Sequence, residues 1–506
     1  MFTVELQNPT SFHSRLKRGD DPDVFTETSK AHSTMQLAAA ICYNASMEKA
    51  KAVAHTIPVG KVWKSAHHTT AEHGDHYASF ILENIPVSLA TFGLHLQNSF
   101  YNSSQRSGRF CHEMFKTNYV SYCEDFLTKF TPIPRGTNAF AEIVQWVVDG
   151  VQYFNRNLGD ITERARDAIL DERPHYAGNI DTQSKRIAQE QLRCFISTIF
   201  PTGMMYTIDL PTLVAFFECA WNKPLYHLFG RMCGTVFTTD KLRDMVKNAM
   251  SFENEVISQH VDIDGESAQR IMVDKIATRV EDVSIPYVPS FLFRDTEIIY
   301  SPKSECLSGE IQTMFEKFNK IQRHKSIDLT QFSPHANPID INNFKSDSGH
   351  EIDNADIVTA VEVSVATFGQ DQRHRTIRRG LPTVTGNVYC PPLLRDHSDD
   401  LRKHMERYMD MARRFGPENM IHFIPYGATV SYVKKADPRA FYHEVRKRRC
   451  LNAQEEIYNL ADMVVGNIFD PNDVHRPGPP CMTGKCSEGD RYCGRDTNFP
   501  VKRILI

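Results

Sequence analysis

The sequence predicts an α+β protein in which one structural element occurs twice. The hexapeptide S-L-A-T-F-G at Ser88–Gly93 returns as S-V-A-T-F-G at Ser364–Gly369. A strand-like stretch precedes each copy, at Tyr77–Ile85 and Ile357–Ser364, and a helical pattern begins with each copy. With 506 residues the chain is also too long for one ordinary core, so two or three domains are expected. Together these observations predict a fused and diverged duplication.

Apolar periodicity predicts further helices in both halves. The expected helices span about 33–42, 87–100, 140–170, 184–200, 210–229, 365–379, 401–415 and 438–468. The prolines of Ile285–Ser290 make that stretch extended and mark a junction near 285–305. A polar stretch at 323–354 is expected to be a loop or an elaborated connection. We therefore expect two tandem domains, 31–285 and 286–470, each a small sheet flanked by long helices. A polar lead-in, 1–30, precedes them, and a Cys/Gly/Pro-rich tail, 471–506, follows.

Composition places the chain among globular proteins without a nucleic-acid or membrane partner. Hydrophobic residues make up 41% and charged residues 24%, and the net charge is −4. The first twenty residues contain no apolar core of signal-peptide length, and no stretch approaches the ~20 apolar residues that a membrane span needs. Twelve cysteines, mostly single, fit reduced thiols better than a disulfide framework. These features predict a cytoplasmic protein.

Two first-half motifs could bind a polar ligand. His67–His73 packs three histidines and one acid into seven residues, which suits a metal site, a cofactor-binding loop or simply an exposed polar loop. Gln105–Arg109 joins a hydroxyl, a flexible glycine amide and a guanidinium, which together suit an anion. Surface turns of this composition are common, so the second pattern is weak on its own.

Clustered cations mark the second half. Arg373-His374-Arg375, followed by Arg378 and Arg379, reads either as a diphosphate clamp at a helix end or as a solvated basic face. Arg446–Arg449 places four cations side by side, which repel one another unless an anion lies nearby.

The C-terminal tail contains soft metal ligands. A zinc site and a tail of free thiols both remain open, because the spacing matches no standard zinc knuckle or ribbon. The residues concerned are His475, Cys481, Cys486 and Cys493.

These elements, in this order, resemble the flavin-dependent thymidylate synthases, the ThyX family. The family carries a histidine loop, then R-H-R and S-x-R-Y signatures, then E-x-A-R and a helix with A-Q-x-E-I. This chain divides one set between its halves. The first half has the histidine loop, S-G-R-F at Ser107–Phe110 and E-R-A-R at Glu163–Arg166. The second half has R-H-R at Arg373–Arg375 and, after Arg448, A-Q-E-E-I at Ala453–Ile457.

The resemblance implies roles for these residues. It implies that Arg448, Arg109 and Ser107 act in catalysis. The expected contacts of dUMP are Ser107, Gly108, Arg109, Gln105, Arg166, Gln370 and Arg448. The expected contacts of FAD are Arg373, His374, Arg375, His67, Thr69, Glu72, Arg439, His443 and Asn452.

The resemblance further implies an enzyme that makes dTMP from dUMP, with methylenetetrahydrofolate as the carbon donor and FAD reduced by NADPH. Family sites lie at the interfaces of a homotetramer, so a fused chain is expected to be a pseudo-dimer that pairs with a second copy. Arg378 stands where the family has serine. A related enzyme that makes another 5-substituted dUMP, such as hydroxymethyl-dUMP, and a non-catalytic nucleotide-binding relative are the alternatives.

Overall fold

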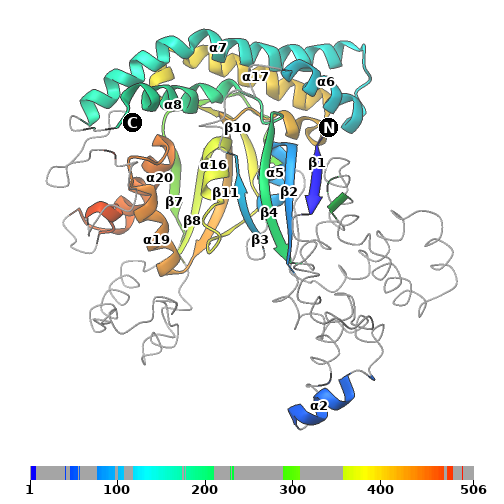
Figure 1. The fold of residues 1–506 in the computed structure, drawn as a ribbon. Helices are drawn as coiled ribbons and strands as arrows, with labels where there is room; N and C mark the ends of the chain where they lie inside the picture. Colours follow the sequence, from blue (N-terminus) through cyan, green and yellow to red (C-terminus); the bar gives the residue numbers. More distant parts are fainter. Residues whose placement is uncertain are drawn as a thin grey trace. The chain divides into compact units, whose positions relative to one another are not determined.

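The computed structural model describes residues 2–6, 46–54, 77–96, 101–106, 118–173, 178–209, 289–307, 357–471 and 476–482, with single positions 40, 56, 176, 228, 231, 232 and 493. Helices and sheets are both present, so the α+β class is confirmed (Figure 1). The chain forms two compact units that interleave in sequence. Unit 1 comprises 1–107, 116–140 and 199–288, and unit 2 comprises 108–115, 141–198 and 289–506.

Unit 1 is built on a four-stranded antiparallel sheet. Its strands are β1 (Thr3–Leu6), β2 (Tyr77–Pro86), β4 (Pro201–Asp209) and β3 (Tyr101–Gln105), in the order β1-β2-β4-β3. Its helices include α2 (Met47–Ala54), α5 (Val87–Phe92), the 3-10 turn η2 (Leu94–Leu96) and α6 (Tyr119–Phe130). Every residue of α5 is buried, which explains why the repeated hexapeptide is made of small and apolar residues.

Unit 2 is built on a seven-stranded sheet. The main path is β5 (Ser290–Phe291), β10 (Thr383–Tyr389), β11 (Ala428–Ala436), β8 (Ile357–Ser364) and β7 (Lys303–Cys306). Two short strands, β6 (Ile298–Ile299) and β9 (Arg378–Arg379), pair with β10 and β11 respectively. The pairs β10·β11, β11·β8 and β8·β7 are antiparallel.

The two sheets share one strand order. β1-β2-β4-β3 of unit 1 corresponds, strand by strand, to β7-β8-β11-β10 of unit 2. In both, a helix follows the second strand without a linker: α5 after β2, and α16 (Val365–Asp371) after β8. In both, helices separate the last two strands of the set in sequence. The two copies of the six-residue repeat thus occupy corresponding places in two sets of four strands with the same order.

Long helices complete unit 2. They are α7 (Asn138–Glu172), whose first three residues fall in unit 1, α8 (Ile180–Leu192) and α17 (Ser398–Phe415), with α18 (Pro417–Met420), α19 (Pro438–Arg448) and α20 (Glu455–Ile468). Short 3-10 turns are η4 (Arg193–Phe195), η7 (Pro392–His397), η8 (Ile421–Phe423) and η9 (Pro480–Met482). α7 and α17 lie side by side, because Trp146 Nε1 donates to the carbonyl oxygen of His404 at 3.0 Å and the two rings stack at 4.5 Å (Figure 1).

Two segments that occupy corresponding places in the repeat pair with each other in unit 2. Residues 194–198 precede β4, and residues 424–427 precede β11. Tyr426 N donates to Ile196 O at 2.9 Å, and Thr198 N donates to Ile424 O at 2.9 Å. The pairing is antiparallel around Ser197 and Pro425, so it relates the two segments by a local two-fold axis.

The strand predictions are confirmed, since β2 and β8 span the expected residues, and the helices predicted over 140–170 and 401–415 are confirmed by α7 and α17. Four helix lengths were wrong. α8 ends at Leu192 because the backbone that follows it pairs with residues 424–427. α5 ends at Phe92, before Gly93, instead of running to residue 100.

The other two errors lie in unit 2. The helix expected over 365–379 ends at Asp371, and Arg378–Arg379 forms a strand on β11. The helix expected over 438–468 is two helices, with a turn at 449–454 between them. Most of the expected helix at 33–42, the helix at 210–229 and the polar stretch 323–354 lie outside the described residues. Among the described helices, none is long and apolar enough to cross a membrane.

Candidate functional site

The candidate site lies in unit 2, around the buried helix α16. Gln454, the last residue of the turn before α20, and the carboxylate of Glu456 in α20 hold α16 at its two ends. At the start of α16, Glu456 Oε1 accepts from Ser364 N at 2.6 Å, and Oε2 accepts from the hydroxyls of Ser364 and Thr367. Ser364 also caps the helix by accepting from Thr367 N at 3.1 Å. Burial raises the pKa of Glu456 to about 7, and its hydrogen bonds oppose part of that shift.

At the other end of α16, four side chains from both halves of the sequence meet, and we call them the Arg193 cluster. Gln454 Oε1 accepts from Arg193 Nη2 at 2.8 Å and from Gln370 Nε2. Arg448 Nη2 donates to the carbonyl oxygen of Gln370. Arg193 comes from the turn after α8, whereas the other three come from α16, α19 and the loop before α20.

The cluster is polar and largely buried. Arg193 is 7% exposed and Gln454 is 1% exposed, and the Arg193 guanidinium lies 5.3 Å from the ring centroid of Tyr426. Arg448 is half-buried, and burial lowers its pKa although Glu444 and Asp371 oppose the shift. One buried and one half-buried guanidinium group with amide partners form a site that suits an anionic, hydrogen-bonding ligand.

Beside the cluster, residues 373–377 form a turn that we call the arginine turn. It follows α16 and is held from within by Arg379. Arg379 Nη1 donates to His374 O at 3.0 Å and to Ile377 O at 2.9 Å, and Nη2 donates to Asp371 O. Arg373 is exposed, whereas His374 and Arg375 are half-buried. The turn therefore offers Arg373 to solvent while its backbone is fixed.

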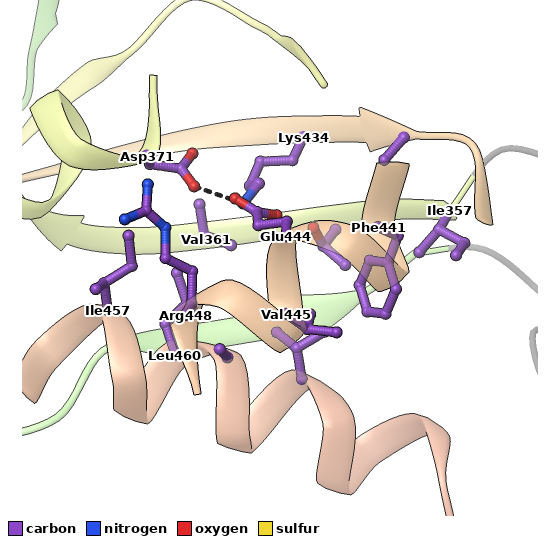
Figure 2. A pocket seen from close by; sticks show the side chains of 14 residues that line it. Ile357, Val361, Asp371, Lys434, Phe441, Glu444, Val445, Arg448, Ile457 and Leu460 are labelled. Carbon is purple, nitrogen blue, oxygen red and sulfur yellow. Dashed lines mark hydrogen bonds and ion pairs between the residues drawn. The ribbon is translucent and has the colours of Figure 1, made fainter. Parts of the chain in front are cut away.

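A buried ion network lies beside the turn, formed by Asp371, Arg379, Lys434 and Glu444. Figure 2 shows Asp371, Lys434 and Glu444 of this network. Asp371 accepts from Arg379 Nε at 2.6 Å, from Lys434 Nζ at 2.7 Å and from the Tyr432 hydroxyl at 2.8 Å. Lys434 Nζ also donates to both carboxylate oxygens of Glu444, at 2.8 and 2.9 Å. Two carboxylates and two cations thus balance in the interior.

The network separates the pKa values of its two acids. Burial opposes ionisation of Asp371, but Arg379 and Lys434 outweigh it and hold the pKa of Asp371 well below its usual range. Burial raises the pKa of Glu444 to about 7, and the neighbouring Asp371 adds to the shift, whereas Lys434 and Arg379, the latter at 3.9 Å, oppose it. Burial and the charge of Arg448 lower the pKa of His374 to about 2, so this imidazole is neutral at physiological pH.

A pocket opens between the sheet and two helices at this network. β8 and β11 form one wall, and α19 and α20 form the other (Figure 2). Most lining side chains are aliphatic, and Phe441 is the aromatic one. The polar groups lie together at one part of the wall: Asp371, Lys434, Glu444 and Arg448.

The structure brings several sequence-predicted residues together and places others elsewhere. Gln370 and Arg448 share the Arg193 cluster, and the His374 and His443 rings lie 5.9 Å apart edge to face. Arg439 lies in the first turn of α19 and Asn452 in the loop before α20. Arg166 is exposed on α7 and pairs with Asp181 at 2.8 Å instead of joining the cluster.

Other predicted residues belong to unit 1 or lie outside the described part of the chain. Gln105 ends β3 and pairs with Met204 of β4. The residues outside the described part are His67, Thr69, Glu72, Ser107, Gly108 and Arg109.

The basic runs resolve into distinct environments. Arg379 is buried in the ion network, so it is not part of a solvent-facing clamp. In the run 446–449, Arg449 pairs with Asp462 at 2.7 Å, and the guanidinium of Arg446 lies 5.7 Å from the Tyr442 ring. Adjacent cations are thus separated by pointing to different partners.

The proposed metal ligands of the tail do not form a metal cluster in the part of the chain that is described. Cys493 packs in a hydrophobic cluster with Leu451 and Tyr458, and Cys481 is half-buried. His475 and Cys486 lie outside the described residues. No group of three His, Cys, Asp or Glu side chains able to hold a metal ion occurs among the residues that are described.

Sequence reasoning missed Arg193 and Arg173. Arg173 is buried at the end of α7 and donates to the carbonyl oxygen of Leu451 at 3.0 Å. A signal for Arg193 existed: C-F-I-S at Cys194–Ser197 returns as H-F-I-P at His422–Pro425. Aligning these runs places Arg193 opposite Ile421, which marks it as a charge present in only one copy.

Comparison with known proteins finds a family that part of the chain resembles. The family model described as thymidylate synthase complementing protein matches residues 23–224. This region of the chain is thus similar to the ThyX family. The match confirms the predicted resemblance and covers α7, α8 and the strands β2 to β4, and it ends before β5.

One curated relative agrees with the ThyX match. A flavin-dependent thymidylate synthase of Clostridium tetani is 29% identical over 91 residues, which is 18% of this chain. The aligned segment spans 36% of that relative's length. No solved structure matches.

Proposed function

We propose that this ThyX-family chain is a flavin-dependent thymidylate synthase that methylates dUMP reductively to dTMP. The observation that carries the proposal is the Arg193 cluster. It joins a buried arginine of the first half to Gln370, Arg448 and Gln454 of the second half, all in one unit. The family match and the Clostridium tetani relative support the flavin-dependent chemistry.

In this proposal the cluster binds the nucleotide. Arg193 and Arg448 supply fixed positive charge, and Gln454 orients Arg193 through the 2.8 Å hydrogen bond. Arg448 is anchored to α16 by its donation to Gln370 O. A cation held beside the uracil would stabilise negative charge that develops on the ring during the reaction. Arg193 thereby takes the part in nucleotide binding that the resemblance gave to Arg166. Ser107, Gly108 and Arg109 remain proposed contacts.

The arginine turn and α19 fit a flavin nucleotide. Arg373, Arg375 and Arg439 are guanidinium donors suited to a diphosphate, and the neutral His374 can donate or accept one hydrogen bond next to a planar ring. FAD, when bound, supplies the hydride. His443 and Asn452, together with His67, Thr69 and Glu72, complete the proposed contacts, with NADPH as reductant and methylenetetrahydrofolate as carbon donor.

We further propose that the chain is a fused duplication with one composite site. The order shared by four strands of each sheet supports the duplication. Where unit 2 has Gln370, the first copy of the hexapeptide is followed by Leu94, which is fully buried. Where the first half has Arg193, the second has the buried Ile421. Each copy has thus replaced one polar group of the cluster by an apolar one. Two fused chains would form a homodimer that corresponds to the family tetramer.

The experiment is spectroscopic and uses the full purified chain. Bound flavin near one per chain, followed by dUMP-dependent turnover with NADPH and methylenetetrahydrofolate, is expected to yield dTMP. Flavin near two per chain would contradict the single composite site. Turnover that gives hydroxymethyl-dUMP would assign the related 5-substituted product. A protein that takes up no FAD would leave only a nucleotide-binding fold.

A further inference from the structure

We infer that Arg379 and Asp371 are positioning residues that hold the arginine turn in a ligand-ready conformation and couple it to α19. The inference rests on the proposed function, because it concerns the flavin contacts of that site. The R-H-R signature does not include these two residues. Asp371 precedes the signature by two positions, and Arg379 follows it by four.

The Arg379 guanidinium acts as a template for the turn. Its three nitrogens contact the carboxylate of Asp371 and three backbone carbonyls, those of Asp371, His374 and Ile377. The first of these carbonyls belongs to the last residue of α16 and the other two follow the helix end, where helical hydrogen bonding stops. A planar group with five fixed donors can satisfy them together, whereas the ammonium of lysine presents a single point of charge.

The same side chain fixes where the turn ends. Arg379 lies in β9 and pairs with Lys434 of β11, and the amide of Gly380 donates to Val433 O at 2.8 Å. The side chain of Arg379 is 4% exposed. The turn is therefore closed at both ends, by α16 and by β11, with Arg379 between them.

The ion network connects the arginine turn to α19. Lys434 bridges Asp371 to Glu444, at 2.7 and 2.8 Å, and Glu444 lies between His443 and Arg448 on that helix. Because Glu444 faces the interior, α19 cannot rotate without breaking the Lys434 contact. The arginine turn and the residues of α19 that flank Glu444 are thus held in one fixed relation.

The test compares two chemically identical substitutions at adjacent residues. Arg379→Lys keeps the charge and the Asp371 ion pair but removes the fork that reaches the carbonyls. Arg378→Lys makes the same change at an exposed residue of the same strand. FAD dissociation constants are measured by flavin fluorescence on the full chain, and dUMP dissociation constants by calorimetry with FAD saturating.

We expect Arg379→Lys to weaken FAD binding at least tenfold and to leave dUMP binding unchanged within error. The thermal midpoint of the control variant, Arg378→Lys, should equal that of wild type within error. FAD binding equal to wild type would overturn the inference. A loss of FAD and dUMP affinity by the same factor would also overturn it, since that outcome reports a general loss of structure.

A second measurement does not depend on flavin. Amide hydrogen exchange of the unliganded chain should be faster in Arg379→Lys at Ile377 and Gly380, whose amides close the turn, and unchanged in β8. Tyr432→Phe, which removes one donor to Asp371, should give the same pattern more weakly if Arg379→Lys does not fold. Wild-type protein that binds no FAD would refute the proposed function, and the exchange pattern would still decide the positioning role. Unchanged exchange in both variants would overturn it.

Discussion

Gly150 of α7 lies so close to the turn after α8 that a methyl group there must displace backbone. A Cβ at Gly150 would lie 2.3 Å from the carbonyl oxygen of Phe195 and 3.3 Å from the His404 ring. Gly159, in the same helix, has open space around its would-be Cβ. Because both glycines are in the helix interior, Gly→Ala gains the same helix propensity at each, roughly 0.5–1 kcal/mol. The difference between the two variants therefore isolates the steric term.

We expect Gly159→Ala to stabilise the chain by about 0.5–1 kcal/mol. Gly150→Ala should be less stable than Gly159→Ala by about 3 kcal/mol, the upper end of the usual range for overpacking, since the obstructing atom is backbone. Urea unfolding followed by circular dichroism measures both midpoints. Since Arg193 begins the 3-10 turn that contains Phe195, Gly150→Ala should also weaken dUMP binding. If Gly150→Ala unfolds at the same urea concentration as Gly159→Ala, the close approach of α7 to this turn is wrong.

Three further predictions concern the site. Arg193→Met should weaken dUMP binding by roughly 10- to 100-fold, the contribution of one charged hydrogen bond. The control Lys185→Met, on the exposed face of α8, should leave dUMP binding unchanged. Equal dUMP dissociation constants for the two variants would exclude Arg193 from the site. Gln454→Ala should cost about 1–3 kcal/mol of stability, because it removes the acceptor of a buried donor of Arg193 and of a half-buried donor of Gln370. An unchanged urea midpoint would contradict this. Glu456→Gln should remove the pH dependence of stability described next.

The sign of that pH dependence follows from the direction of the Glu456 shift. Its pKa in the folded chain is raised from 4.5 to about 7, so the folded state favours the protonated acid. The resulting stability is fully present below pH 4.5 and is lost as the pH rises to 7, by on the order of 3 kcal/mol. Urea midpoints between pH 4.5 and 7 should therefore fall less in Glu456→Gln than in wild type. Parallel curves would show that folding does not raise the pKa of Glu456.

Local patterns were enough to predict the strands and long helices that lie next to the site. β8 alternates buried and partly buried residues, and α7 keeps an apolar period over its whole length, so periodicity located both. Helix ends were predicted poorly where tertiary contacts end a helix. α16 stops at Asp371 because Arg379 binds the carbonyls beyond it, and no local rule reads a contact of that kind.

The site was predicted in part, through the resemblance. The resemblance assigned both Gln370 and Arg448 to the nucleotide, and these two residues lie together. Arg193 joins them through its hydrogen bond to Gln454, a contact over more than 200 positions of sequence that no local pattern shows. Adjacent arginines were also indistinguishable by sequence. Arg378 is exposed and Arg379 is buried, although both belong to a strand of two residues that is too short to show a period.

The pairing of residues 194–198 with 424–427 bears on how this protein is made. On the ribosome, α7 and α8 emerge long before α17, whose His404 and Tyr408 rings pack against Trp146, and before Leu393, which packs against the apolar cluster of α7 and α8. Synthesis at about 5–20 residues per second leaves roughly 10–50 seconds between the two segments. During that interval the His404 and Tyr408 rings that pack on Trp146 are absent, so this part of α7 is open to other chains. We therefore expect nascent chains that end near residue 230 to bind chaperones, and chains extended beyond residue 470 to be released.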